Sequence, residues 1–115
     1  MGVTEYFFSV PIFDVTVHVW VASNPCLFRN NEAVTKIFRG PNEDGDGWDA
    51  ICLDPVDDHF GLIFDSEKLT NNLFAHELYH LTNAILRLHS IDDEETGALL
   101  HGYLFEEIGA EVFRK

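Results

Sequence analysis

The period of the apolar residues changes near residue 70, and this change limits the chain to an α+β fold. Between residues 14 and 20, three valines alternate with polar residues, which is the period of a half-buried β-strand. After residue 70 the apolar residues recur at helical spacing, and residues 62–96 contain no Gly or Pro. We therefore expect a small sheet followed by two helices, all within a single domain of residues 1–115.

Strand-forming residues fill most of the first half. Val, Phe and Ile predict strands over residues 5–21, 48–53 and 60–64. Pro11 marks an edge or a bulge in the first of these segments. Residues 31–39 favour a short helix with Asn30 or Asn31 as its cap, and a strand is the alternative there. The sheet that we expect from this half is small and antiparallel.

Two helices account for the second half. The first follows Thr70, which can cap it, as can Ser66. Its apolar residues at helical spacing are Leu73, Phe74, Leu78, Leu81, Ile85 and Leu88. Residues 90–93 interrupt this pattern and supply a new cap, so a second helix is expected from about Asp93 to Val112.

The chain is strongly acidic. Asp and Glu number 20 against 7 Lys and Arg, so the formal charge is −13. Such a field repels phosphate groups, which argues against nucleic acid and anionic membranes as partners and favours cationic partners or metal ions. The alternative is that the acidity only keeps a Phe-rich protein soluble. No apolar run approaches the roughly 18–20 residues that span a bilayer.

The cysteines and the N-terminus indicate a reduced, intracellular protein. Cys26 and Cys52 are too few for a disulfide framework, and they form no CxxC motif. The N-terminal apolar stretch has no basic region before it, so it does not have the pattern of a secretory signal.

The segment His76-Glu77-Leu78-Tyr79-His80 is an HExxH motif within the first predicted helix. Residues four apart lie on one helix face, so His76 and His80 can bind one zinc ion through neutral imidazoles. Glu77 lies about 100° round the helix and can take a proton from a zinc-bound water, whose pKa falls to about 7. The alternative is a pair of surface histidines without a metal.

A third zinc ligand must come from elsewhere in the chain. Leu86 stands where the extended HExxHxxGxxH motif places its third His, and His89 lies on the wrong side of the helix. Carboxylates of the second helix remain as candidates, namely Glu94, Glu95, Glu106 and Glu107. We prefer Glu95, because small residues at Ala98 and Gly102 would let the second helix approach the first. First-turn acids that complement the helix dipole are the alternative for Glu94 and Glu95.

Three further features carry weaker predictions. His101 is expected to be a core or interface histidine rather than a ligand. Tyr103 can donate a hydrogen bond to an oxyanion, but a packed tyrosine is the more ordinary role. Residues 42–53 resemble the start of an EF-hand loop, yet Leu53 stands where Glu is required, so we expect a hairpin turn there.

The run HELYHLTNAIL followed by EETGALLHGYLFEEI resembles the small HExxH metallopeptidase-like proteins encoded by tailed bacteriophages. These proteins are similar in outline to minimal gluzincins and to the ImmA/IrrE peptidase domain. The resemblance implies zinc ligands at His76, His80 and Glu95, and a catalytic base at Glu77. It also implies a protein or peptide substrate, and Gly61–Phe64 stands where such folds often place a sheet edge that can pair with a peptide. An ordinary edge or central strand is the alternative for that segment.

Two functions of different class follow. The first is a zinc metallopeptidase acting in the cytoplasm of an infected host. The second is a non-catalytic structural or binding protein with a zincin-like fold, such as a virion component, in which a fourth protein ligand such as His101 would close the metal site. A third and weaker possibility is a metal-free interaction module that uses the acidic face. Because the loop 89–93 is short, Glu106 replaces Glu95 as third ligand if that loop cannot place Glu95 opposite the histidines.

Overall fold

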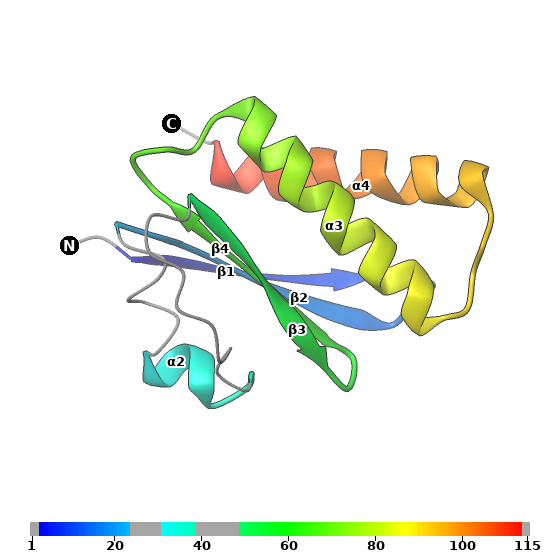
Figure 1. Cartoon of the computed structure of the whole chain (residues 1–115), viewed down its shortest axis with the longest axis horizontal. Helices are drawn as coiled ribbons and strands as arrows, with labels where there is room; N and C mark the ends of the chain where they lie inside the picture. Colours follow the sequence, from blue (N-terminus) through cyan, green and yellow to red (C-terminus); the bar gives the residue numbers. More distant parts are fainter. Residues whose placement is uncertain (1–2, 24–30, 39–48, 114–115) are drawn as a thin grey trace.

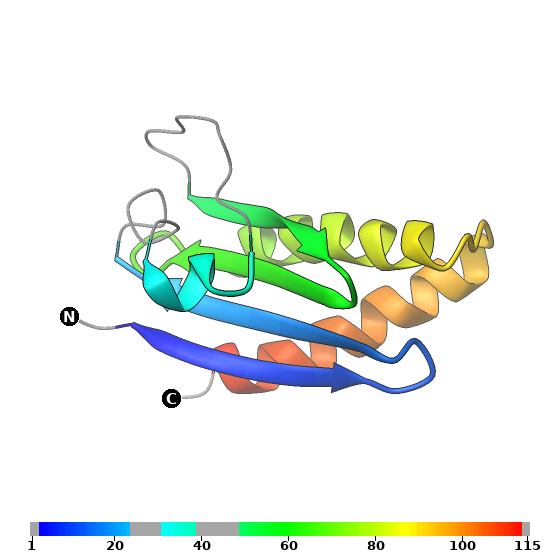
Figure 2. The ribbon, with the colours of Figure 1, turned by 90° about the horizontal axis from the view of Figure 1, so that it is seen from below.

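The chain folds as an α+β domain in which a mixed sheet lies between helices (Figure 1). A computed structural model describes residues 3–23, 31–38 and 49–113. The elements in chain order are β1 (Thr4–Val10), β2 (Val15–Ala22), α2 (Glu32–Thr35), β3 (Ala50–Val56), β4 (His59–Asp65), α3 (Asn71–Leu88) and α4 (Glu94–Val112). The helices α3 and α4 cover one face of the sheet, and α2 lies on the other face (Figures 1 and 2).

The sheet has the strand order β1-β2-β4-β3 within the described residues. The pairs β1–β2 and β3–β4 are antiparallel, whereas β2 and β4 run parallel. The prediction of an antiparallel sheet is therefore wrong for the central pair. Five consecutive residues of β4, Phe60–Phe64, are all buried, as is typical of a strand covered on both faces. This strand accordingly lies in the middle of the sheet, and β3 takes the edge.

The predicted strand over residues 5–21 is in fact a hairpin of β1 and β2. Its turn, Pro11–Asp14, follows the last residue of the edge strand β1. Ile12 and Asp14 have φ angles of 74° and 55°, which is left-handed backbone that glycine or asparagine would adopt more easily. Because neither residue type is present in the turn, an ordinary hairpin signal is lacking from residues 11–14.

The second sheet face is covered by α2 and its flanks. Asn31 caps the helix, its side chain accepting a hydrogen bond from the Ala33 N–H at 2.8 Å, as predicted, but the helix is shorter than residues 31–39. Val34 and Phe38 pack on Trp20 of β2. β2 is therefore buried on both faces rather than half-buried, and His18 is only 3% exposed.

The two C-terminal helices begin where the sequence predicts. Thr70 accepts a hydrogen bond from the Leu73 N–H at 3.1 Å, and Asp93 accepts one from the Thr96 N–H at 2.9 Å. A hydrogen bond donated by the Thr96 hydroxyl, and secondarily the one from its N–H, lower the pKa of the Asp93 carboxyl. Neither helix, nor any other within the described ranges, is long and apolar enough to cross a membrane.

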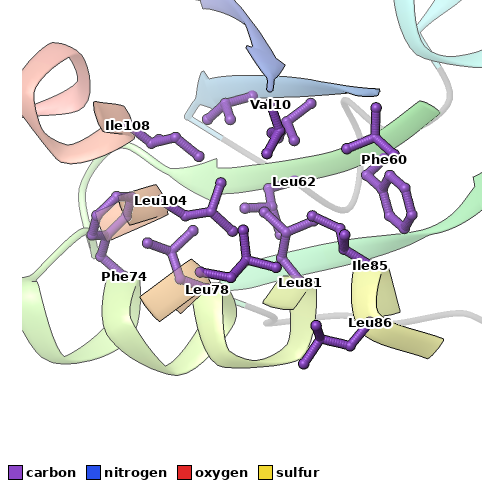
Figure 3. Close-up of a cluster of buried hydrophobic side chains, with 14 of the residues drawn as sticks. Val10, Phe60, Leu62, Phe74, Leu78, Leu81, Ile85, Leu86, Leu104 and Ile108 are labelled. Carbon is purple, nitrogen blue, oxygen red and sulfur yellow. The ribbon is translucent and has the colours of Figure 1, made fainter. Parts of the chain in front are cut away.

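The main core fills the space between the sheet and the two long helices (Figure 3). Its buried residues from α3 and α4 include Phe74, Leu78, Leu81, Ile85, Leu100, Leu104 and Ile108. They meet the valines of β2 and the aromatic and aliphatic residues of β4. The buried residues of α3 determine which side of this helix faces the sheet, and they therefore also determine which side faces water.

Candidate metal centre

The HExxH residues lie in the first half of α3, on the side that the core leaves free. Leu78 points into the core, whereas the two histidines that flank it are exposed. The His76 side chain is 65% exposed. The helix therefore presents both imidazoles to solvent, where a dissolved metal ion can reach them.

The two imidazoles lie within hydrogen-bond distance of each other. His76 Nε2 and His80 Nε2 lie 3.2 Å apart, and their ring planes cross at 78°. Two nitrogens that each bind a tetrahedral zinc ion at 2.0–2.1 Å stand about 3.3–3.4 Å from each other. The observed separation fits a shared ion, so these two nitrogens could hold one with little movement.

Glu77 lies beside the pair in a more enclosed position. Its side chain is 13% exposed, and its Oε2 lies 3.9 Å from His76 Nε2. Burial raises the pKa of the Glu77 carboxyl, and the neighbouring charges of His76 and His80 oppose this rise. A desolvated carboxylate at this position is a stronger base than one in water, and it is close enough to act on a water molecule beside the histidines.

An open hollow extends from Glu77 and His76 toward the sheet. Its other walls come from Asp49 and Ala50 at the start of β3, and from Lys68 and Asn72 before and within α3. Lys68 Nζ lies 3.8 Å from Asp49 Oδ1, and both side chains are largely exposed. The hollow therefore brings the start of the sheet edge next to the candidate base.

The sheet edge near the site is β3. The sequence left open whether Gly61–Phe64 forms an edge or an ordinary strand, and the structure places it centrally between β2 and β3. An extended peptide cannot pair there, because both neighbouring positions are filled. Contacts between α3 and β3 bring the edge strand beside the helix that carries the histidines.

A third metal ligand is not assembled around the histidines. Among the described residues, no His, Cys, Asp or Glu completes a group of three that could hold a metal ion. His101 Nε2 lies 3.4 Å from the Ala75 carbonyl, so His101 stands opposite the start of the motif. Glu95 precedes His101 by six residues, which separates the two by about 9 Å along the axis of α4. The side chain of Glu95 is exposed. Glu95 stays a prediction as third ligand.

The rival carboxylates lie on different sides of α4. Glu94, together with Ala98 and His101, lines a groove whose opposite wall is Tyr79, Asn83 and Arg87 of α3. Glu106 and Glu107 are exposed. Of the four carboxylates considered, Glu94 is thus the one placed in a groove between the two helices.

Of the two small residues that the sequence suggested for the approach of α4 to α3, Ala98 lies in the groove between the helices, but Gly102 does not contact α3. A Cβ at Gly102 would meet no atom within 4 Å, so this glycine makes no close contact. A Cβ at Gly97 would instead stand 3.2 Å from Leu86 Cδ1, and one at Gly109 would stand 3.2 Å from the Phe74 ring. The expectation for Gly102 is therefore wrong. The close approach of α4 to α3 occurs at Gly97 and Gly109 instead.

The other predicted residues have structural roles or lie outside the described ranges. His101 is an interhelical histidine, as predicted, with its ring 6.3 Å from the Tyr79 ring. His89 bonds to the carbonyls of Ile85 and Phe13 at the end of α3, away from the motif. Cys26 and residues 42–48 of the acidic loop lie outside the described residues.

No protein-family model matches the chain, and comparison with curated proteins and with solved structures finds no similar sequence or fold. The side chains of α3 and their surroundings are therefore the basis on which a function can be inferred.

Proposed function

We propose that this protein is a zinc-dependent metallopeptidase with a minimal zincin-like fold. The observation that carries the proposal is the 3.2 Å separation of His76 Nε2 and His80 Nε2, which matches two ligands of one tetrahedral ion. Two imidazole nitrogens suit zinc, and they leave positions open for a carboxylate and for water or substrate. The resemblance to phage-encoded HExxH proteins agrees with this donor set.

Each residue of the site would have a separate chemical role. His76 and His80 hold the ion, with a carboxylate of α4, Glu95 by the resemblance, as the third ligand. When bound, zinc supplies a Lewis acid that polarises a peptide carbonyl and acidifies water. Glu77, with its raised pKa, accepts the proton of the attacking water and passes it to the amine that leaves when the C–N bond breaks.

The hollow beside Glu77 gives a substrate a place to lie. Asp49 and Ala50 bring β3, the outermost strand among the described residues, into this hollow, and an extended peptide can add to an outermost strand through backbone hydrogen bonds. The scissile bond of such a peptide would then lie close to Glu77 and the two histidines. This arrangement supports a peptide, rather than a small molecule, as substrate.

A non-catalytic binding domain is the second candidate. It is favoured by the exposure of His76 and by the lack, among the described side chains, of a third donor grouped with the pair. In that case a metal ion would bind weakly, or would bind only when a partner supplies a further ligand. Glu77 would then have no catalytic role.

Replacement of Glu77 by Gln tests the proposal. The zinc-loaded chain is incubated with a peptide library, and new amino termini are identified by mass spectrometry. We expect the parent to cleave peptides and Glu77→Gln to lose at least about a hundredfold of that activity while zinc content stays unchanged. Glu32→Gln, in α2 on the other side of the sheet, is the matched control and should keep full activity. Cleavage by Glu77→Gln at the parental rate would exclude the assigned role.

A further inference from the structure

A further hollow is lined by none of the HExxH residues. It is about 320 Å³ in volume and lies between the β1–β2 turn and α4. Its walls are Pro11, Ile12 and Phe13 from the turn, and Leu99, Leu100 and Tyr103 from the helix, with Val10 and Thr96 at the margin. We call these six residues the turn–helix groove. Thr96 supplies the one polar side chain apart from the Tyr103 hydroxyl.

The groove exposes large apolar side chains that folding does not bury. Ile12 is 97% exposed, Leu99 is 68% exposed and Tyr103 is 39% exposed. Ile12 also has a φ of 74°, a left-handed conformation that is unusual for a β-branched residue. The turn therefore holds an isoleucine outward under strain, although the core gains nothing from its side chain. Exposed apolar side chains gathered around a hollow are candidates for contact with a partner.

The surroundings of the groove are acidic. Leu99 and Tyr103 lie one helical turn apart, and Glu106 and Glu107 follow Tyr103 by three and four residues. Both glutamates are exposed, and α4 contains no Lys or Arg. The apolar stripe of the helix therefore ends at two carboxylates.

We propose that the turn–helix groove binds a cationic amphipathic segment of a protein partner. An apolar side chain of the partner would enter the groove between Ile12 and Leu99, and its lysines or arginines would lie against Glu106 and Glu107. Charge decides between this occupant and a second copy of the chain. Two copies of charge −13 would bring their acidic α4 helices together, whereas a basic segment gains attraction at the same positions.

The test uses a synthetic helical peptide with leucines on one face and lysines on the other. Its affinity for the full chain is measured by fluorescence anisotropy at physiological salt, beside a matched peptide with glutamates in place of the lysines. We expect the basic peptide to bind with micromolar affinity and the acidic peptide to bind at least about tenfold more weakly. Amide NMR shifts on binding should concentrate at the turn–helix groove.

Variants of the chain distinguish binding at the turn–helix groove from nonspecific attraction to the acidic protein. Leu99→Asp should weaken the basic peptide at least about tenfold, and Leu99→Ala, which keeps the helix, should weaken it in the same direction. The double variant Glu106→Gln, Glu107→Gln should weaken it by about two- to tenfold. Leu88→Asp, at a 48% exposed leucine of α3 outside the groove, is the control and should bind as the parent does.

Four results would overturn the proposal. They are no binding at about 1 mM peptide, equal binding of the acidic peptide, equal loss in Leu99→Asp and Leu88→Asp, and shifts confined to other surfaces. Two further results would assign the groove to another occupant. Self-association in sedimentation equilibrium that Leu99→Asp abolishes would indicate a second copy, and Leu99-dependent binding to phosphatidylcholine vesicles would indicate a lipid surface.

Discussion

His76 Nε2 and His80 Nε2 lie 3.2 Å apart on the solvent side of α3, while Leu78 between them is buried in the core. The helix therefore fixes the two ligands by its own geometry, and the packing of Leu78 against the sheet fixes the rotation of the helix. A metal ion need not reorganise the backbone to bind here.

We predict that the chain binds zinc in equimolar amount and that each histidine is needed. Either His76→Gln or His80→Gln should bring the zinc content well below that level, because one imidazole binds zinc more weakly than two imidazoles that bind it together. His59→Gln, on the opposite side of the sheet, should keep the ion. Elemental analysis of dialysed protein measures the content, and the absorption of the cobalt-substituted chain reports the ligand geometry. Full zinc in either variant would show that the pair is not the site.

We predict that Glu95→Gln weakens zinc binding by at least about tenfold, since an outer-shell partner alone is worth that much. Glu94→Gln should have little effect if the resemblance places the ligand correctly. Competition with a zinc chelator of known affinity measures both variants under one condition. If only Glu94→Gln weakens binding, the carboxylate in the groove between α3 and α4 is the ligand instead.

We predict opposite stability effects for alanine at two glycines. In Gly61→Ala the new Cβ would stand 2.8 Å from Leu53 Cδ1 and 2.9 Å from Phe38 Cζ, so the variant should lose about 1–3 kcal/mol of unfolding free energy. Gly102 lies exposed in α4 with no atom near its Cβ position, so Gly102→Ala should gain about 0.5–1 kcal/mol through helix propensity. Urea denaturation measures both. A stable Gly61→Ala would mean that β4 is less tightly enclosed than the structure shows.

The parts of the fold that local signals determine could be predicted from the sequence. The boundaries of α3 and α4 follow from helical periodicity and from caps at Thr70 and Asp93, all of which depend on neighbours within one turn. The proximity of His76 and His80 is local for the same reason. These features need no knowledge of the rest of the chain.

Features that depend on distant segments could not be predicted. The apolar run of β4 indicates a buried strand, but it does not say that β2 lies beside it in parallel. The burial of His18 depends on α2 covering that face, and the turn at Ile12 uses a residue that rarely turns a chain. The third ligand could not be predicted for the same reason, because the docking of α4 on α3 decides which carboxylate approaches the histidines.

We predict that His18 makes the stability of the fold sensitive to mild acid. His18 is buried, and its Nε2 lies 2.9 Å from Nδ1 of the half-exposed His59, which itself contacts Asp58. Burial, and secondarily the charge of His59, lower the pKa of His18 below 6.5, its value in an unfolded chain. Between the two pKa values the unfolded chain binds more protons, so its population increases as pH falls.

The contribution of His18 is therefore complete above about pH 6.5 and is lost as the pH falls below it toward the folded pKa. His18→Leu, which cannot titrate, should flatten the fall in unfolding free energy from about pH 7 to about pH 5, measured by urea denaturation at each pH. Because only a group whose pKa differs between folded and unfolded states can create such a slope, an unchanged slope in His18→Leu would show that the acid sensitivity arises elsewhere.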